Sequence, residues 1–368
     1  MEYLGATYRL IADGGDVERR AEALALEQTV ELPRAAVRDA FVEQEIVGEV
    51  DEIEIDPAGG FRVAIRYPVA VTALDPAQLL NVLFGNASLQ EDVFLIDVEP
   101  PPSLMEALGG PRFGIDGIRE ASGARGRPLT CAALKPMGSS PDALGDLCET
   151  FARAGIDVIK DDHGLADHPF CPFEERVRAC ARGIERASRE TGGRSLYAPN
   201  LIGTPAVLAR QLAVAEEGGA GAVLVAPLVV GLPVFWELTR RSSLPVLAHP
   251  ALAGGPRIAP AVLLGILFRL YGADAVVFPH AGGRFPLTAE ICRELGDRMR
   301  RPWGSIRTTL PMPAGGMSVE RTRELIAFYG IDAMLLVGGS LYEAGDGIET
   351  RTRAFVKRVH DEGRRRAS

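Results

Sequence analysis

The stretch Gly155-Ile156-Asp157-Val158-Ile159-Lys160-Asp161-Asp162-His163 joins a short, mostly apolar run to a charged string. Residues 156–159 are too few for a helix, and their pattern predicts a strand that is buried on both faces. Because successive strand residues point to opposite faces, Lys160 and Asp162 should point the same way. A buried strand that ends in chemically active side chains is typical of an α/β fold, in which the functional site lies where parallel strands end.

Other short apolar runs repeat this plan through the rest of the chain. The eight expected strands are residues 129–134, 156–159, 195–198, 222–226, 245–248, 273–278, 308–312 and 333–337. Stretches of one helix length lie between them, including residues 141–154, 173–190, 204–217, 258–271, 287–298 and 319–329. Eight βα units over about 230 residues predict a closed (β/α)8 barrel, a TIM barrel, as the domain of residues 101–368. A doubly wound open sheet is the alternative, although the chain lacks the G-x-G-x-x-G turn of its dinucleotide-binding form.

Residues 1–100 follow a different order, β-α-β-β-α-β. The expected strands are residues 3–11, 46–55, 61–67 and 93–98, and the expected helices are residues 17–26 and 76–84. This order predicts a ferredoxin-like α+β domain with an antiparallel sheet. Pro100-Pro101-Pro102 lacks three successive N–H donors, and we therefore place the domain boundary there.

Composition and charge exclude several classes of protein. Of the 368 residues 47% are hydrophobic and 24% charged, which is typical of a globular chain with a full core. The net charge of −9 disfavours nucleic acid as a partner. We expect neither a membrane span nor a secretory leader, because apolar runs of about 18 residues and a basic start are both missing. Five cysteines without a C-x-x-C pair indicate a reducing, cytoplasmic location.

Polar side chains follow several of the expected strands. Lys135 follows the first strand, Asn200 the third, His249 the fifth and His280 the sixth. With His163 after the second strand, three of the five histidines lie at strand ends, which is where a barrel builds its active site. The alternative for each histidine alone is a structural side chain whose hydrogen bonds are satisfied.

Two glycine pairs, Gly315-Gly316 and Gly338-Gly339, follow the seventh and eighth strands. Barrels bind phosphate at this place, because bare backbone N–H groups face the anion there. The pairs therefore predict a phosphorylated substrate, and two tight turns are the alternative.

Lys160 and Asp162 together suggest a metal site. A carboxylate suits a hard cation such as Mg²⁺, but a free ammonium beside it would repel the cation. The pair makes sense if CO₂ converts Lys160 into an anionic carbamate, and a plain lysine–aspartate ion pair is the alternative.

Four segments resemble motifs of the large subunit of RuBisCO: Ala133-Leu134-Lys135-Pro136, the run from Gly155 to Asp162, Phe84-Gly85-Asn86 and Ala314-Gly315-Gly316. Their order along the chain is similar as well. The resemblance implies that Lys160 is the carbamylated metal ligand, that Asp162 is the next ligand and that Lys135 handles the enolate. It further implies two active-site histidines, His249 and His280. Glu27 and Asn86 match residues that complete the neighbouring subunit's site in a homodimer or a higher oligomer of dimers.

The chain departs from the carboxylating pattern at several positions. His163 stands at the position of a glutamate metal ligand, Met137 replaces a second lysine, and Pro250 replaces an arginine. In the loop after His280, Arg284 is the only nearby cation, where carboxylating enzymes have a lysine. These changes resemble a form IV, non-carboxylating RuBisCO-like protein that enolises a monophosphate.

The resemblance therefore implies a Mg²⁺-dependent isomerase of the 5-methylthioribulose-1-phosphate type in methionine salvage. The alternatives are a diketo-phosphate enolase, a decarboxylase or transcarboxylase of a branched 3-oxo acid phosphate, and a catalytically silent barrel that binds a sugar phosphate. His163 is either the third metal ligand or a residue that caps the second strand's turn or contacts substrate.

Overall fold

The computed structural model describes residues 2–367, which divide into two compact units. The first unit runs to Gly110 and includes Leu252–Tyr271 and Trp303–Ile306. The second unit comprises Pro111–Ala251, Gly272–Pro302 and the chain from Arg307 onward. Along residues 2–367, no helix combines the length and the apolar character needed to cross a bilayer.

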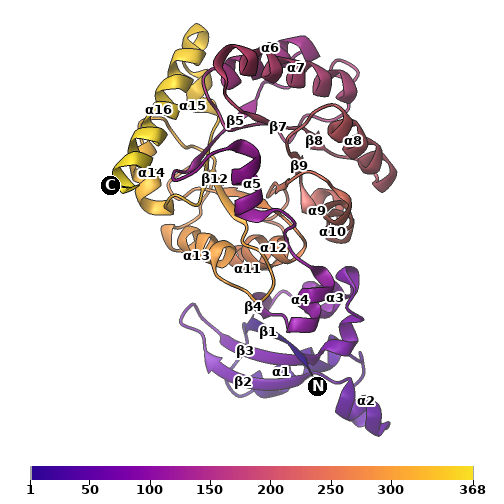
Figure 1. The fold of residues 1–368 in the computed structure, drawn as a ribbon. Coiled ribbons are helices and arrows are strands. Elements are labelled where there is room, and N and C mark those ends of the chain that lie inside the picture. Colours follow the sequence, from indigo (N-terminus) through magenta and orange to yellow (C-terminus); the bar gives the residue numbers. More distant parts are fainter. Residues whose placement is uncertain (1, 368) are drawn as a thin grey trace. The chain divides into compact units, whose positions relative to one another are not determined.

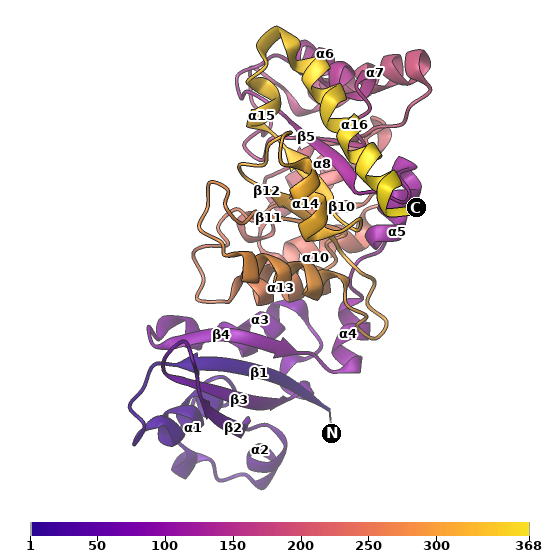
Figure 2. The ribbon, with the colours of Figure 1, turned by 90° about the vertical axis from the view of Figure 1, so that its left-hand side faces the viewer.

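The first unit contains a four-stranded antiparallel sheet. Its strand order is β2 (Glu49–Ile55), β3 (Phe61–Pro68), β1 (Tyr3–Leu10) and β4 (Val93–Glu99), as Figure 2 shows. Helices α1 (Val17–Glu27) and α3 (Pro76–Phe84) complete the predicted β-α-β-β-α-β order. Every second residue of β1 is buried, which is the pattern of a sheet with one face on a core. The expected α+β domain with an antiparallel sheet is confirmed.

Among the described residues, five short helices of the first unit were not predicted, and one predicted helix is divided into three segments. The short helices are η1 (Arg34–Ala36), α2 (Ala40–Glu45), η2 (Val69–Thr72), η3 (Asn86–Leu89) and α4 (Pro102–Leu108). The expected helix of residues 258–271 consists of α11 (Pro260–Val262), the π-helical segment η4 (Leu263–Leu267) and α12 (Phe268–Leu270). It joins the first unit because its side chains are buried there and the hydroxyl of Tyr271 donates to the carbonyl of Pro76.

The second unit contains two parallel sheets. One has the order β13 (Met334–Val337), β5 (Leu129–Leu134), β6 (Val158–Asp161) and β7 (Leu196–Ala198). The other has the order β12 (Leu310–Ala314), β11 (Ala275–Pro279), β10 (Val246–Ala248), β9 (Val223–Val225) and β8 (Asn200–Leu201). All eight predicted strands are present within about two residues of their expected bounds, and β8 continues the third of them.

Helices cover the strands of the second unit, as Figure 1 shows. They are α5 (Gly114–Ser122), α6 (Pro141–Arg153), α7 (Phe173–Thr191), α8 (Pro205–Glu217), α9 (Pro227–Val230), α10 (Leu232–Arg241), α13 (Ala289–Arg300), α14 (Thr322–Tyr329), α15 (Gly339–Tyr342), η5 (Gly345–Gly347) and α16 (Ile348–Ala367). This covering explains why the strands are apolar on both faces.

The two parallel sheets share one hydrophobic core. The core takes buried side chains from β5, β6, β7, β9, β10, β11, β12 and β13, many of them at every second position, such as Leu310 and Met312. β7 and β8 are separated by Pro199, which has no N–H group for a ladder. The N–H groups of Ala222 and Leu224 donate to the carbonyls of Tyr197 and Pro199, which links the sheets at this point.

Closure of the predicted barrel is not complete in the hydrogen-bond pattern. β12 and β13 lie in contact, but within residues 2–367 no strand ladder pairs them. The structure therefore confirms parallel α/β sheets under helices, whereas the closed barrel stays a prediction.

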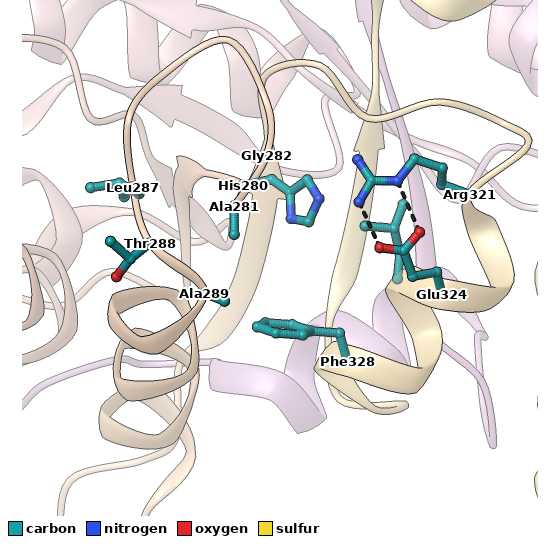
Figure 3. A pocket seen from close by; sticks show the side chains of 10 residues that line it. His280, Ala281, Gly282, Leu287, Thr288, Ala289, Arg321, Glu324 and Phe328 are labelled. Atoms are coloured by element: carbon teal, nitrogen blue, oxygen red, sulfur yellow. Dashed lines mark hydrogen bonds and ion pairs between the residues drawn. The ribbon is translucent and has the colours of Figure 1, made fainter.

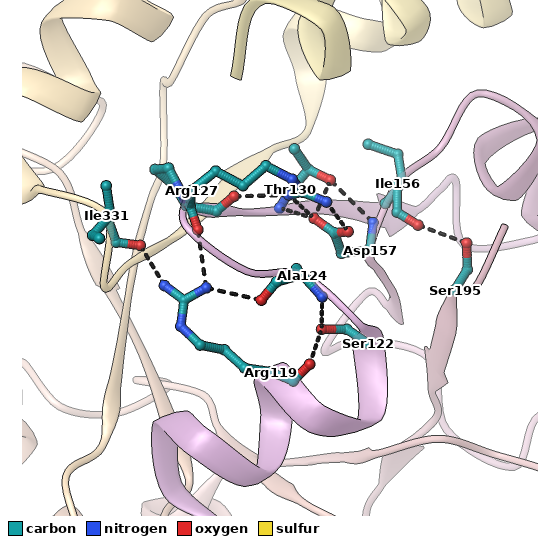
Figure 4. Close-up of polar contacts among 10 residues, drawn as sticks. Arg119, Ser122, Ala124, Arg127, Thr130, Ile156, Asp157, Ser195 and Ile331 are labelled. Carbon is teal, nitrogen blue, oxygen red and sulfur yellow. Dashed lines mark hydrogen bonds and ion pairs between the residues drawn. The ribbon is translucent and has the colours of Figure 1, made fainter. Parts of the chain in front are cut away.

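A buried carboxylate ties the start of β5 to the start of β6. Asp157 accepts hydrogen bonds from both terminal nitrogens of Arg127 at 2.7 Å, and from the backbone N–H and hydroxyl of Thr130 at 2.8 and 2.9 Å (Figure 4). Arg119 fixes the same end of the unit by donating to the carbonyls of Ala124, Arg127 and Ile331. The amino ends of the strands are thus held by charged clamps.

Replacing Asp157 by alanine tests this clamp. Asp157→Ala leaves a nearly buried guanidinium and a buried amide without their acceptor, so the free energy of unfolding should fall by about 3–5 kcal/mol. Urea unfolding measures the change. The matched control is Asp146→Ala, at an exposed position of α6, where we expect the free energy of unfolding to fall by less than about 0.5 kcal/mol. An equal loss of unfolding free energy in the two variants would show that Asp157 does not stabilise the ends of β5 and β6.

Candidate active site at the ends of β5 and β6

The parallel pairing of β5 and β6 brings the predicted lysines and carboxylate together. Lys160 is paired with Ala133 and Asp161 with Leu134, so Lys135 and Asp162 both come one residue after the ladder. The ammonium nitrogen Nζ of Lys135 lies 2.6 Å from Oδ2 of Asp162. This contact agrees with the expectation that polar residues at the ends of neighbouring strands lie close together.

Lys160 is buried, with 2% of its surface exposed, and its Nζ donates to the carbonyl of Asp161 at 2.9 Å. Burial lowers the pKa of Lys160, because taking an ammonium out of water disfavours its charged form. A neutral amine is the form of lysine that can react as a nucleophile.

Asp162 remains ionised although it is half-buried. Burial alone would raise the pKa of its carboxyl, but hydrogen bonds with His163 and Lys135 hold that pKa well below its usual range. The site therefore keeps one fixed negative charge beside two amines.

His163 and His249 stack face to face. Their ring centroids are 4.1 Å apart and the ring planes differ by 9°. Burial, helped by the nearby charges of Lys160 and His163, lowers the pKa of His249 to about 2, so this imidazole is neutral. The N–H of Ala251 donates to Nδ1 of His249, which assigns its proton to Nε2. Nδ1 of His163 lies 3.5 Å from Oδ1 of Asp162.

A buried ion pair that the sequence analysis missed lies between the two ligand positions. Asp161 points to the opposite face from Lys160 and Asp162, and it accepts from Nε of Arg176 on α7 at 3.0 Å. Both side chains are fully buried. The hydroxyl of Tyr197 and the backbone N–H of Asn200 donate to the same carboxylate at 2.8 and 3.0 Å. The alternation of β6 was the available signal, because it sends Asp161 toward the helix layer.

Asn200 holds the turn that follows β6. Its amide donates to the carbonyls of His163 and Leu165 at 3.0 and 2.9 Å. Asn200, the polar residue expected at the end of the third strand, therefore stabilises the loop that follows β6.

The loop after β11 packs on the first glycine pair. The N–H of Arg284 donates to the carbonyl of Gly315 at 2.9 Å, and a Cβ on Gly316 would lie 3.0 Å from the Cα of Gly283. Gly315 and Gly316 both have positive φ, at 83° and 99°. Close approach and backbone conformation thus both require glycine here. The guanidinium of Arg284 lies over the ring of Phe285.

The second glycine pair is open. In the described part of the chain, a Cβ on Gly338 or Gly339 would meet nothing within 4 Å, so there is room for a ligand beside this backbone. The helix that follows, α15, has only four residues, and it adds little to an anion site. A ligand at this loop would therefore meet mainly the backbone of the two glycines.

His280 lies at the end of β11, beside a cavity of about 490 Å³ that Figure 3 shows. Its Nδ1 is 2.9 Å from the hydroxyl of Tyr329, whereas its Nε2 is buried and has no hydrogen-bond partner among residues 2–367. Burial lowers the pKa of His280. The apolar walls include Leu287, Leu325 and Phe328. The guanidinium of Arg321, which lines the cavity, is bonded to both carboxylate oxygens of Glu324.

Glu27 and Asn86 meet in the first unit. Nδ2 of Asn86 donates to Oε1 of Glu27 at 2.9 Å. Next to them, the amide of Gln28 donates to the carbonyl of Val82 and accepts from the N–H of Ala87. The structure thus places the two predicted partner-site residues side by side.

The chain has three lysines, Lys135, Lys160 and Lys357, among 40 lysine and arginine residues. Two of the three lie at the ends of neighbouring strands. An arginine cannot give up its proton, whereas a lysine can act as a base or a nucleophile. This scarcity is a further sequence signal that the two lysines do chemistry.

The unmodified side chains do not form a metal site. Within residues 2–367, no group of three His, Cys, Asp or Glu residues is placed to hold a metal ion. Asp162 supplies a carboxylate and His163 an imidazole, and a carbamate on Lys160 would add the missing oxygen donor. The donor set therefore fits Mg²⁺ once Lys160 has reacted with CO₂.

Comparison with known proteins gives consistent matches along the chain. The model of the ribulose bisphosphate carboxylase large chain, catalytic domain, matches residues 114–272. A relative from Rhodospirillum rubrum, named 5-methylthioribulose-1-phosphate isomerase, is 44% identical over 97% of this chain and 96% of that protein. One from Geobacillus kaustophilus, named 2,3-diketo-5-methylthiopentyl-1-phosphate enolase, is 32% identical over 96% and 91%. The crystal structure of a Rubisco-like protein from Rhodopseudomonas palustris matches with a TM-score of 0.90 and 44% identity, over 98% of both chains.

The three lysines should differ sharply toward an amine-selective reagent. We expect exposed Lys357 to react fastest, Lys135 more slowly because it is 39% exposed and ion-paired, and buried Lys160 hardly at all. Asp162→Asn should raise the labelling of Lys135 by removing its ion pair. Peptide mass spectrometry measures each site, and Asp297→Asn on the exposed face of α13 is the control. Labelling of Lys160 at the rate of Lys357 would contradict this geometry.

Proposed function

The chain belongs to the RuBisCO large-chain family as one of its non-carboxylating RuBisCO-like members, and from this membership we propose that it isomerises 5-methylthioribulose-1-phosphate in methionine salvage. The observation that carries the proposal is the cluster of Lys135, Asp162 and buried Lys160 at two adjacent strand ends. This cluster is suited to moving a proton next to a carbonyl.

The enolising parts are present while the carboxylating parts are not. Met137 and Pro250 stand where carboxylating relatives have cations, and Arg284 lies against Phe285 as the only cation of its loop. An enolase acting on a diketo phosphate would use the same cluster. The isomerase is favoured because the relative with that name is 44% identical and the one named an enolase 32%.

The reaction needs a proton to leave one carbon beside the ketone and a proton to return to another carbon of the enolate. The carbamate on Lys160 would take the first proton, and the ammonium of Lys135, which Asp162 holds at 2.6 Å, can return a proton to the enolate. Neutral His249 donates through Nε2, and it can stabilise the developing oxyanion without adding a charge.

Lys160 as a carbamate, Asp162 and His163 would hold Mg²⁺. The bound cation would stabilise negative charge on the substrate's oxygen atoms. His163 is a neutral donor where carboxylating relatives have a carboxylate, so the site should bind the hard cation less tightly than theirs.

The substrate's two ends require different surroundings. The backbone of Gly338 and Gly339, with Gly315 and Gly316 on the next loop, would take the phosphate. The cavity beside His280 suits an uncharged, apolar end such as a methylthio group, because Leu287, Leu325 and Phe328 line it and Glu324 neutralises Arg321.

Two larger features are part of the same proposal. The shared core of the two parallel sheets, together with the contact of β12 with β13, supports one closed (β/α)8 barrel. The resemblance implies a homodimer in which the Glu27–Asn86 pair in the first unit of one chain completes the partner's site.

The proposed reaction is tested in D₂O with 5-methylthioribulose-1-phosphate. We expect an isomeric ketose phosphate that has gained deuterium at carbon, and Lys135→Met should slow this reaction by about 10²- to 10⁴-fold. Lys357→Met is the matched control and should not change the rate. NMR follows both events. Exchange of deuterium without an isomer would indicate an enolase instead, and binding without exchange would indicate a silent barrel.

Metal binding should depend on CO₂. Mg²⁺ with bicarbonate should raise the melting temperature, because the ligands bind only the folded state, whereas Mg²⁺ alone should have little effect. With ¹³C-bicarbonate, NMR should show one carbamate signal in the wild type and in Lys357→Ala, but none in Lys160→Ala. Equal binding of Mg²⁺ by Lys160→Ala would rule out the carbamate.

Mixing two inactive variants tests the shared site. If Lys135 and Asn86 of one site come from different chains, hybrids of Lys135→Met and Asn86→Ala have one intact site. Random mixing then restores about one quarter of the wild-type activity. No recovery, or a mass of one chain in light scattering, would refute the shared site.

A further inference from the structure

Tyr342 links two loops that meet at the ends of β13 and β5. It is the last residue of α15, the helix that follows Gly338. Its hydroxyl donates to the carbonyl of Ala133 at 2.7 Å and accepts from the backbone N–H of Lys135 at 2.9 Å. One hydroxyl thus bonds both the carbonyl that precedes Leu134 and the N–H that follows it.

These two bonds continue the β13–β5 ladder after the backbone has left it. The ladder pairs Val337 with Ala132 as its last step, and then the chain turns away into Gly338 and Gly339. Ala133 and Lys135 would have no partner from β13 at this point. A hydroxyl can donate and accept at the same time, so Tyr342 satisfies both groups, which phenylalanine could not do.

The ring of Tyr342 is itself held in place. It packs edge-on against Phe151 of α6, with the ring centroids 6.0 Å apart and the planes at 82°. The hydroxyl position is therefore set by the course of the Gly338–Gly339 loop and by α6. A displacement of that loop moves the support of Lys135.

We propose that Tyr342 is a positioning residue that couples the Gly338–Gly339 loop to Lys135. This proposal rests on the proposed function, in which the loop binds the phosphate of the substrate. A phosphate bound at the loop would fix the backbone of Lys135, and through it the amine that lies 2.6 Å from Asp162. Lys135 would then be aligned for proton transfer only while a phosphorylated ligand is bound.

The test compares Tyr342→Phe with Thr309→Val. Both variants lose a hydroxyl that donates to a carbonyl: the hydroxyl of Tyr342 is part-buried, and that of Thr309 is buried and bonds Ala273 at 2.8 Å at the amino end of β12. Each variant should lower the melting temperature by a few degrees, so that Thr309→Val reports the effect of lost stability alone. Thr309 lies at the opposite end of the strands from the site, and Thr309→Val should keep the wild-type activity.

The first readout does not depend on activity. An amine-selective reagent gives the labelling ratio of Lys135 to Lys357, which is exposed on α16 and serves as the internal reference. We expect inorganic phosphate to lower this ratio in the wild type and in Thr309→Val, but not in Tyr342→Phe. Without phosphate, Tyr342→Phe should raise the ratio about fivefold, the factor that corresponds to one hydrogen bond.

The second readout is the isomerisation of 5-methylthioribulose-1-phosphate. Tyr342→Phe should lower kcat by about 10- to 100-fold while KM changes little, because a misplaced amine costs rate and the phosphate contacts remain. An unchanged labelling ratio, an equal response to phosphate in all three proteins, or an unchanged kcat each overturns the coupling. If the wild type has no isomerase activity, the proposed function fails, and the labelling ratio alone decides the role of Tyr342.

Discussion

The buried ion pair of Asp161 with Arg176 is the constraint on which the site depends. Asp161 lies between the two predicted metal ligands, and three donors from α7, β7 and β8 hold its carboxylate. A pair buried this deeply gives little net stability, because desolvation offsets the attraction, but breaking it leaves a charge without a partner. It therefore specifies position: with Asp161 fixed on one face of β6, Lys160 and Asp162 must lie on the other face.

Stability and chemistry occupy opposite ends of the same strands. At the amino ends, Asp157 is held by hydrogen bonds from Arg127 and Thr130 and serves the fold. At the carboxyl ends, Lys135, Asp162 and the open backbone of Gly338 retain groups that can act on a substrate. This division is the usual one for parallel barrels, in which loops at one end can change while the clamps at the other end keep the fold.

The positions of a few lysine and glycine residues define the chemistry of the site. Arginine serves nearly every structural ion pair in this chain, whereas two of the three lysines lie at the strand ends where a proton can be moved. The two glycine pairs are not equivalent. Gly315 and Gly316 are required by positive φ and by the approach of the loop at Gly283, whereas Gly338 and Gly339 border open space. Only the first pair is required by the close approach of another loop.

The sequence by itself determined the order of strands and helices, the antiparallel first sheet and the gathering of Lys135 and Asp162, because periodicity and the register of adjacent parallel strands are local properties. It could not determine that residues 252–271 join the first unit, that His163 stacks on His249, or that Arg176 and Tyr342 support the site. Each of these depends on which surfaces meet after the chain has folded. Contacts between residues far apart in sequence leave no periodic signal, so only the tertiary structure decided them.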